Sequence, residues 1–125
     1  MLRAVASGAP SIRVGRLDTR RDFTDVRDVV RAYRLILQAG VRGDVYNVCS
    51  GVDRSIADIA AAIMSRLGTH VELVPDADLQ RPSDLPVLRG DNTKICQATA
   101  WAPVISFEES IAAVVDDLSD RQQAS

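Results

Sequence analysis

The sequence predicts an α/β fold with few short strands and several amphipathic helices. Apolar residues recur at helical spacing in three long segments, and short runs rich in β-branched residues lie between those segments. Helices interleaved with strands are typical of α/β architecture. The length of 125 residues suits one domain, and 46% apolar with 26% charged residues is ordinary for a globular fold that forms a core.

The first part of the chain predicts two strands and a helix. Residues 11–14 form a strand that ends at Gly15, and residues 20–24 form a second one. Asp25 then caps a helix that ends before Gly40. One side of this helix is apolar and consists of Val26, Val29, Val30, Tyr33 and Leu37.

The segment DVYNVC, residues 44–49, predicts a strand because it combines β-branched and aromatic residues and ends at Ser50-Gly51. Ser55 and Asp58 have the spacing of a capping box and open the next helix. Gly68 is a natural C′ residue for that helix.

The last part of the chain predicts two more strands and two more helices. Residues 70–74 and 87–88 predict short strands, and Asp91 caps a short helix that reaches about Thr99. Ser106 and Glu109 form a second capping box before the last helix. We interpret His70, the only histidine, as a structural residue of the first of these strands, and Trp101 as a packing residue.

Bulk composition excludes two classes of partner. A net charge of −2 argues against nucleic acid, and no apolar run approaches the roughly 20 residues of a membrane helix. The N-terminal stretch MLRAVASGAP is too short and interrupted for a signal peptide. Cys49 and Cys96 lack metal-ligand spacing and are expected to be reduced thiols, so we expect a cytoplasmic protein.

The tetrapeptide Arg81-Pro82-Ser83-Asp84 is a candidate anion site. Proline biases Arg81 toward extended geometry, and a forked guanidinium can bind two phosphate oxygens at once. Asp84 accepts hydrogen bonds, as a sugar hydroxyl requires. The alternative is a loop arginine paired with a nearby carboxylate, and the residues alone leave it open.

Arg20 and Arg21 form a second candidate, because they precede a predicted helix N-terminus. The alternative is a surface pair neutralised by Asp18 and Asp22. The sequence contains no Gly-x-Gly-x-x-Gly, no P-loop, no Tyr-x-x-x-Lys and no metal cluster. It therefore shows no catalytic residues and no cofactor-binding residues of its own.

Four segments, taken in order, carry a resemblance to a known family: RRDFTDVRDVVRAY, GDVYNVCSG, RPSDLPVLRGDNTK and WAP…SFEESI. Together they resemble the C-terminal part of the extended short-chain dehydrogenase/reductases that act on nucleotide sugars. The residues of these motifs are most similar to those of the GDP-sugar branch, which contains GDP-mannose 4,6-dehydratases and GDP-4-keto-6-deoxy-mannose reductases. The resemblance runs over residues ~11 to ~118.

The resemblance implies a Rossmann-type enzyme whose N-terminal half binds NADP or NAD and carries the catalytic set. This chain then corresponds to the smaller C-terminal part, with residues 1–118 as the nucleotide-sugar-binding portion and 119–125 as a frayed tail. It also implies that the strand at 44–49 joins the Rossmann sheet, which explains why the helices have more apolar surface than the short strands can cover.

The resemblance also assigns residues. Arg81 matches a diphosphate-binding arginine, and Asp84 matches an acidic position near the nucleotide ribose. Arg21 matches an arginine that lines the diphosphate or sugar site. Leu17 ends a segment that closes over the nucleotide, where the family commonly has Gly-Asn-Leu and this chain has Gly15-Arg16-Leu17.

We therefore expect part of a GDP-mannose-type dehydratase or 4-keto-reductase that contacts the nucleotide diphosphate sugar and is not catalytic alone. The expected partners are a GDP-sugar and, if the gene is split, a separate chain that carries the Rossmann half. The alternative is a stand-alone, non-catalytic module that binds a nucleotide sugar or another protein.

Overall fold

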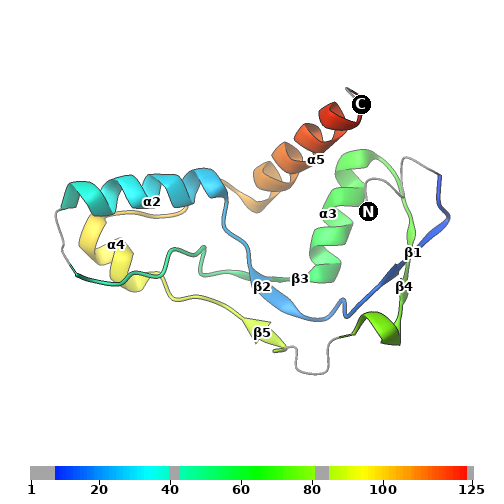
Figure 1. Cartoon of the computed structure of the whole chain (residues 1–125), viewed down its shortest axis with the longest axis horizontal. Helices are drawn as coiled ribbons and strands as arrows, with labels where there is room; N and C mark the ends of the chain where they lie inside the picture. The colour runs from blue at the N-terminus through cyan, green and yellow to red at the C-terminus, as the bar shows by residue number, and fades with distance from the viewer. Residues whose placement is uncertain (1–7, 40–42, 81–84, 124–125) are drawn as a thin grey trace. The chain divides into compact units, whose positions relative to one another are not determined.

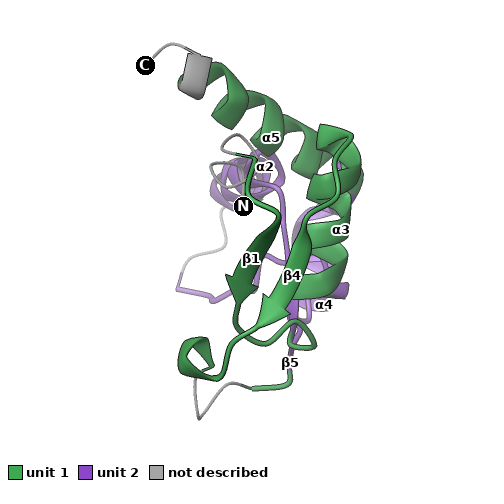
Figure 2. Ribbon diagram, turned by 90° about the vertical axis from the view of Figure 1, so that its right-hand side faces the viewer, with its two compact units in different colours: residues 1–19, 55–86, 108–125 green, residues 20–54, 87–107 purple. Residues whose placement is uncertain are grey.

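A computed structural model describes residues 8–39, 43–80 and 85–123. The chain divides into two compact units (Figure 2). Unit 1 consists of residues 1–19, 55–86 and 108–125, and unit 2 consists of residues 20–54 and 87–107. Because each unit combines segments that are distant in sequence, each is described here by itself.

Unit 1 contains a two-stranded parallel sheet and two long helices. Strand β1 (Ser11–Val14) pairs with β4 (Glu72–Pro75) in the register Ser11 with Glu72 (Figure 2). Helix α3 (Ile56–Leu67) precedes β4, and a 3₁₀ turn, η1 (Ala77–Leu79), follows it. Helix α5 (Phe107–Gln123) is the last element.

Unit 2 contains a small sheet and two helices. The sheet has the order β3-β2-β5, formed by Arg20–Asp22 (β2), Asp53–Ser55 (β3) and Val87–Leu88 (β5). Strands β2 and β5 are parallel, with Arg20 opposite Val87. Helix α2 (Val26–Ala39) lies beside the short helix α4 (Thr93–Thr99), as Figure 1 shows.

The two units have cores of different composition. In unit 2, Ala32, Ile95 and Trp101 form a buried cluster. Leu35, Ile36, Tyr46, Val48 and Cys96 pack against that cluster. Among the described residues of unit 1, the buried apolar ones are Ala60, Val71 and Val115, and none of them is as large as Trp101.

The signals at the ends of the helix α3 are confirmed. Ser55 accepts a hydrogen bond from the Asp58 amide at 3.0 Å, and Asp58 accepts one from the Ser55 amide at 2.9 Å, so the capping box is complete. Gly68 has φ 62°, a left-handed conformation that glycine adopts without steric cost. Asp91 also accepts a hydrogen bond from the Thr93 amide at the start of α4.

The strand predicted over residues 44–49 is wrong. Burial does alternate as in a strand, with Tyr46 and Val48 turned toward the cluster and Val45 and Asn47 exposed. However, the segment pairs with none of the described strands. A strand requires a neighbour for its backbone groups, and local sequence says nothing about whether that neighbour is present.

Three element boundaries also differ from the predictions. Strand β2 ends at Asp22 rather than at residue 24, and β4 begins at Glu72, so His70 is an exposed residue before the strand. Helix α5 continues through Gln123. Fraying of residues 119–125 in solution stays a prediction.

Candidate functional site

The three-stranded sheet of unit 2 carries the described arginine candidates. Strand β2 lies in the centre of this sheet, between β3 and β5. Successive side chains on a strand point to opposite faces of the sheet. Arg20 and Arg21 therefore lie on opposite faces of this sheet, and they face different environments.

The face that carries Arg20 is organised by one carboxylate between two arginines. The guanidinium of Arg20 pairs with the Asp53 side chain and donates to the Asp53 carbonyl at 3.0 Å. Arg89 lies 3.6 Å from the same carboxylate. The hydrogen bond from Arg20 is the main cause that lowers the pKa of Asp53 below its ordinary value, although desolvation opposes it.

Asp22 ties the end of β2 to two other segments of unit 2. Its Oδ1 accepts from the Ser50 amide at 2.9 Å, and its Oδ2 accepts from the amides of Gly51 at 2.9 Å and Gly90 at 3.3 Å. A Cβ at Gly90 would meet the Cys49 sulfur at 2.5 Å, so only glycine fits this approach. Asp22 therefore fixes the strand that carries Arg21.

Arg21 is partly buried, and its Nη1 donates to the Arg20 carbonyl at 2.7 Å. The alternative interpretation named Asp18 and Asp22 as partners of the arginine pair, whereas the structure pairs Arg20 with Asp53. Asp18 pairs with Arg16 at 2.7 Å, and the main acceptor role of Asp22 is toward backbone amides. No sequence pattern marks this role, because a carboxylate that binds distant amides has no local signature.

Leu17 belongs to unit 1 and is partly buried. Its carbonyl accepts from the Ala57 amide at 3.0 Å, and the Thr19 carbonyl accepts from the Ile56 amide at 3.0 Å. The segment before it approaches η1 closely, because a Cβ on Gly15 would lie 2.8 Å from the Leu79 oxygen. The segment is thus anchored to the start of α3, while its expected contact with a nucleotide stays a prediction.

Arg81 and Asp84 lie outside the described residues. Of the four predicted site residues, the structure therefore places Leu17 in unit 1 and Arg21 in unit 2. Their assembly into one site stays a prediction.

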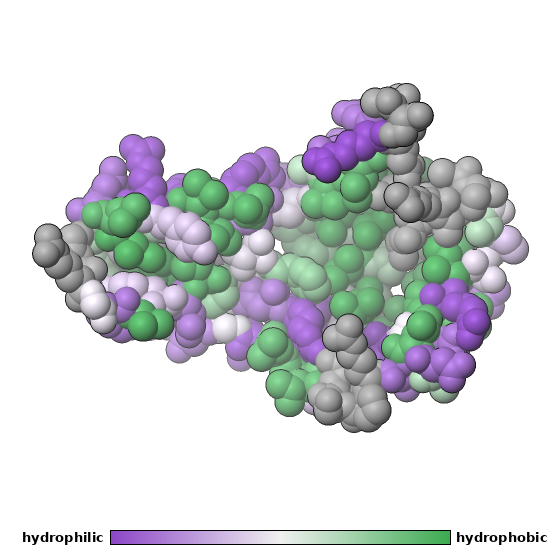
Figure 3. All heavy atoms as spheres, viewed as in Figure 1, coloured by the Kyte–Doolittle hydropathy of each residue, from purple (hydrophilic) through white to green (hydrophobic). Residues whose placement is uncertain are grey.

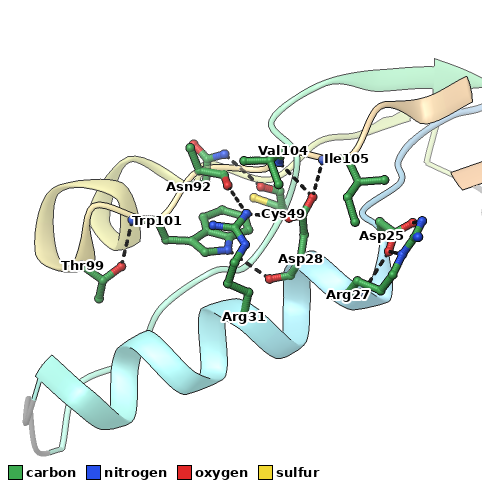
Figure 4. Close-up of polar contacts among 11 residues, drawn as sticks. Asp25, Arg27, Asp28, Arg31, Cys49, Asn92, Thr99, Trp101, Val104 and Ile105 are labelled. Carbon is green, nitrogen blue, oxygen red and sulfur yellow. Dashed lines mark hydrogen bonds and ion pairs between the residues drawn. The ribbon is translucent and has the colours of Figure 1, made fainter. Parts of the chain in front are cut away.

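A second carboxylate supports the helix that follows Arg21. Asp28 is 1% exposed and accepts from the amides of Val104 and Ile105, each at 3.0 Å (Figure 4). Burial raises its pKa, but the hydrogen bonds from Arg31 and these two amides outweigh burial and hold the pKa of Asp28 below its ordinary value. Trp101 donates from its indole nitrogen to the Asp28 carbonyl at 3.0 Å.

The described helix that follows a strand directly does not offer a cradle for a dinucleotide. At the start of α3, the amides of Ile56, Ala57 and Asp58 donate to the Thr19 carbonyl, the Leu17 carbonyl and the Ser55 hydroxyl. A pyrophosphate needs such amides for itself. The start of α3 therefore has no spare amides for the pyrophosphate of a dinucleotide. In the part of the chain that the structure describes, no helix is long and apolar enough to cross a membrane, and no group of His, Cys, Asp and Glu suits a metal ion.

Comparison with solved structures defines the class of protein. The chain superposes on RMD from Pseudomonas aeruginosa, solved in complex with NADPH, with a TM-score of 0.86 and 33% identity over 94% of this chain and 39% of that chain. It also superposes on a putative epimerase from Burkholderia cenocepacia with a TM-score of 0.85 and 32% identity over 94% of this chain and 39% of that chain. Its α/β fold matches the C-terminal part of the extended short-chain dehydrogenase/reductases.

The particular family follows from the sequence relatives. The family described as GDP-mannose 4,6 dehydratase matches residues 1–114, and the chain belongs to that family. GDP-6-deoxy-D-mannose reductase from Pseudomonas aeruginosa is 34% identical over 113 residues, which are 90% of this chain and 37% of the reductase. Human GDP-mannose 4,6 dehydratase is 28% identical over 82% of this chain and 32% of its own length. The chain thus spans about a third of the length of these relatives.

Proposed function

We propose that this chain supplies part of the nucleotide-sugar site of a GDP-mannose-type dehydratase or 4-keto-reductase. The observation that carries the proposal is the family match over residues 1–114, with a reductase and a dehydratase among the relatives. The proposed contacts come from Arg81, Asp84, Arg21 and Leu17.

The chemistry of these residue types supports the proposed roles. Arginine binds phosphate oxygens in a forked, charge-assisted geometry, so Arg81 and Arg21 hold the diphosphate. Asp84 accepts from a ribose hydroxyl. Leu17 ends the segment that covers the nucleotide, and its backbone anchor at the start of α3 supports a fixed position for that segment.

The proposed role is to bind and orient the substrate, and no step of the reaction is assigned to a residue of this chain. In this proposal the NADP or NAD that supplies hydride chemistry is held by the rest of a complete enzyme, because the first amides of α3 are already bonded within the chain. The proposed compartment is the cytoplasm, which the free thiols of Cys49 and Cys96 support.

The surface of α2 supports a further polypeptide partner. Val30 and Leu37 on one side of this helix are 60% and 82% exposed, and Figure 3 shows apolar atoms at the surface over α2. The cofactor-binding half, in the same polypeptide or in a separate chain, is the proposed occupant of this side. This proposed partner can be tested by co-expression with a chain that carries the glycine loop and Tyr-x-x-x-Lys. A dehydratase or reductase assay then measures whether the pair is active. Absence of turnover with a folded partner counts against it.

The expected affinity of the chain for substrate is low. A hydrogen bond to a charged group contributes about 1.5–3 kcal/mol, so two arginines contribute about 3–6 kcal/mol. Association costs at least about 4 kcal/mol. GDP-mannose must therefore be titrated into the millimolar range.

The direct test follows amide resonances of the ¹⁵N-labelled chain during a GDP-mannose titration. Saturable shifts that are lost in Arg81→Ala support the proposal. Arg66→Ala is the matched control, because it removes the same charge from an exposed arginine that pairs with Asp116. The proposal is contradicted if the wild-type chain shows no shifts. It is also contradicted if Arg81→Ala binds GDP-mannose as well as Arg66→Ala does.

The stand-alone module is the second candidate, and the presence of a buried cluster within unit 2 favours it. It requires that the isolated chain unfolds cooperatively and gains stability with GDP-mannose. A molten chain that exposes apolar surface to a dye favours a part that needs its other half.

A further inference from the structure

Residues 44–49 of unit 2 run beside α4 (Figure 1) and follow the alternation of a strand. Tyr46 and Val48 pack against the buried cluster, while Val45 is 79% exposed. Within the described part of the chain, the amides and carbonyls of Tyr46, Asn47 and Val48 form no hydrogen bond with another backbone group. A backbone edge of this kind readily pairs with a strand of another polypeptide segment.

Lys94 of α4 holds the beginning of this segment. Its ammonium group pairs with the Asp44 side chain and donates to the Val45 carbonyl at 3.0 Å. The same nitrogen lies 4.9 Å from the centre of the Tyr46 ring, a distance typical of a cation–π contact. The hydrogen bond from Lys94 is also the main cause that lowers the pKa of Asp44 below its ordinary value. One side chain thus contacts three successive residues of the segment.

The residues just before Lys94 hold the rest of the segment. The side-chain amide of Asn47 donates to the Asp91 carbonyl at 3.3 Å. The side-chain amide of Asn92 donates to the Cys49 carbonyl at 2.9 Å. These contacts involve one side chain and the two ends of the segment. The backbone groups in its middle therefore remain available for a ladder.

The occupant of this edge follows from the length of the relatives. The chain spans 37% of the Pseudomonas aeruginosa reductase and 39% of the solved RMD chain, so most of the length of those proteins has no counterpart in it. Through the buried cluster, α2 covers one face of the segment, as a helix covers a strand in an α/β layer. Such a layer needs further strands beside the first one.

We propose that Lys94 is the positioning residue of a docking strand, which residues 44–49 offer to the edge of a β-sheet in the remaining part of the enzyme. This inference rests on the proposed function, because the occupant is the cofactor-binding half that is proposed to cover α2. A strand that is already held in place loses less conformational entropy when it pairs. Loss of Lys94 therefore weakens the association of the two parts.

Hydrogen exchange tests whether this segment is the strand that pairs. The probe is the remaining part of the Pseudomonas aeruginosa reductase, expressed as a separate chain. In the chain alone the amides of residues 44–49 should exchange rapidly, and in the purified pair their exchange should slow at least about tenfold. If the pair forms while exchange at residues 44–49 stays fast, this inference is wrong and the proposed function stands.

Two further outcomes overturn the inference. If the two folded chains do not associate, the docking strand is wrong, whereas GDP-mannose shifts that depend on Arg81 would still support the proposed function. If residues 44–49 of the chain alone become protected as its concentration rises, a second copy is the occupant and the assigned partner is wrong.

Substitutions of Lys94 test its positioning role. Lys94→Met keeps the apolar stem, removes the charge and should weaken association about fivefold, whereas Lys94→Arg should restore most of the affinity. Arg66→Met is the matched control in unit 1, because Arg66 has a similar exposure of 48% against 54% for Lys94 and also pairs with an aspartate. It should change the affinity less than about twofold.

The fluorescence of Trp101 verifies that unit 2 is folded in each variant. A structural role of Lys94 alone would change the stability of unit 2 and leave the association constant of the folded chains unchanged. Equal association constants for wild type and Lys94→Met would therefore overturn the positioning role.

Discussion

Unit 1 and unit 2 satisfy their backbone groups in different ways. Unit 1 relies on backbone partners and helix caps: the β1–β4 ladder, the capping box of α3 and the glycine at the end of that helix. Unit 2 has shorter ladders, and two carboxylates accept backbone amides from segments that are distant in sequence. The comparison teaches that a fold with few paired strands needs side-chain acceptors in the interior. We therefore expect unit 2 to be more sensitive than unit 1 to single substitutions.

The largest expected effect is the loss of Trp101. It is 1% exposed and belongs to the buried cluster of unit 2, so Trp101→Ala should lower the free energy of unfolding by about 3–5 kcal/mol. Val71→Ala in unit 1 is the matched control and should cost at most about 2 kcal/mol, because it removes less buried apolar area. Urea unfolding followed by circular dichroism measures both. Equal losses would remove the contrast between the units.

The next effect concerns Asp28. Asp28→Asn weakens the hydrogen bonds to Val104 and Ile105 and should cost about 1–3 kcal/mol at neutral pH. In the wild-type protein the fluorescence of Trp101, the only tryptophan, reports unfolding of unit 2. Ser65→Ala, an exposed position on α3, serves as a control with little expected change.

The difference in free energy of unfolding between wild type and Asp28→Asn should depend on pH, because the pKa of Asp28 is lowered in the folded protein. Because the folded-state pKa lies below the unfolded value, the ionised carboxylate stabilises the fold above about pH 4, and this contribution is lost as the pH falls further. The stability gap between wild type and Asp28→Asn should therefore narrow on acidification. A gap that stays constant between pH 6 and about pH 3 contradicts the assignment.

A smaller effect is expected for the capping box of unit 1. Ser55→Ala removes the acceptor of the Asp58 amide and should cost about 1 kcal/mol. Ser55→Asn retains an acceptor at the cap and should restore most of the loss. Thermal unfolding detects the difference. A cost as large as that of Asp28→Asn would show that unit 1 is not the more tolerant unit.

The smallest effect is expected for the surface ion pair of unit 1. Nη2 of Arg66 lies 2.6 Å from Oδ1 of Asp116, but the two side chains are 48% and 53% exposed. Arg66→Ala should cost less than about 1 kcal/mol, and added salt should reduce the cost because it screens the pair. Denaturation at low and high salt measures it. A salt-independent loss would mean that the arginine stabilises through packing.

Sequence alone predicted the elements that depend on local chemistry. The capping box at Ser55 and the glycine at position 68 marked the ends of α3, because caps involve residues within one turn. The short strand at residues 87–88 was confirmed as β5. The family resemblance was confirmed by the match over residues 1–114, because its four segments stand in a fixed order.

The tertiary structure decided what depends on distant partners. Residues 44–49 have the composition of a strand but pair with none of the described strands, since a ladder requires a neighbour that local sequence does not specify. Asp22 and Asp28 are acceptors of distant amides, a role that only the packed segments revealed. Periodicity thus fixes where helices and turns form, whereas the position of a side chain relative to other segments emerges only when those segments pack together.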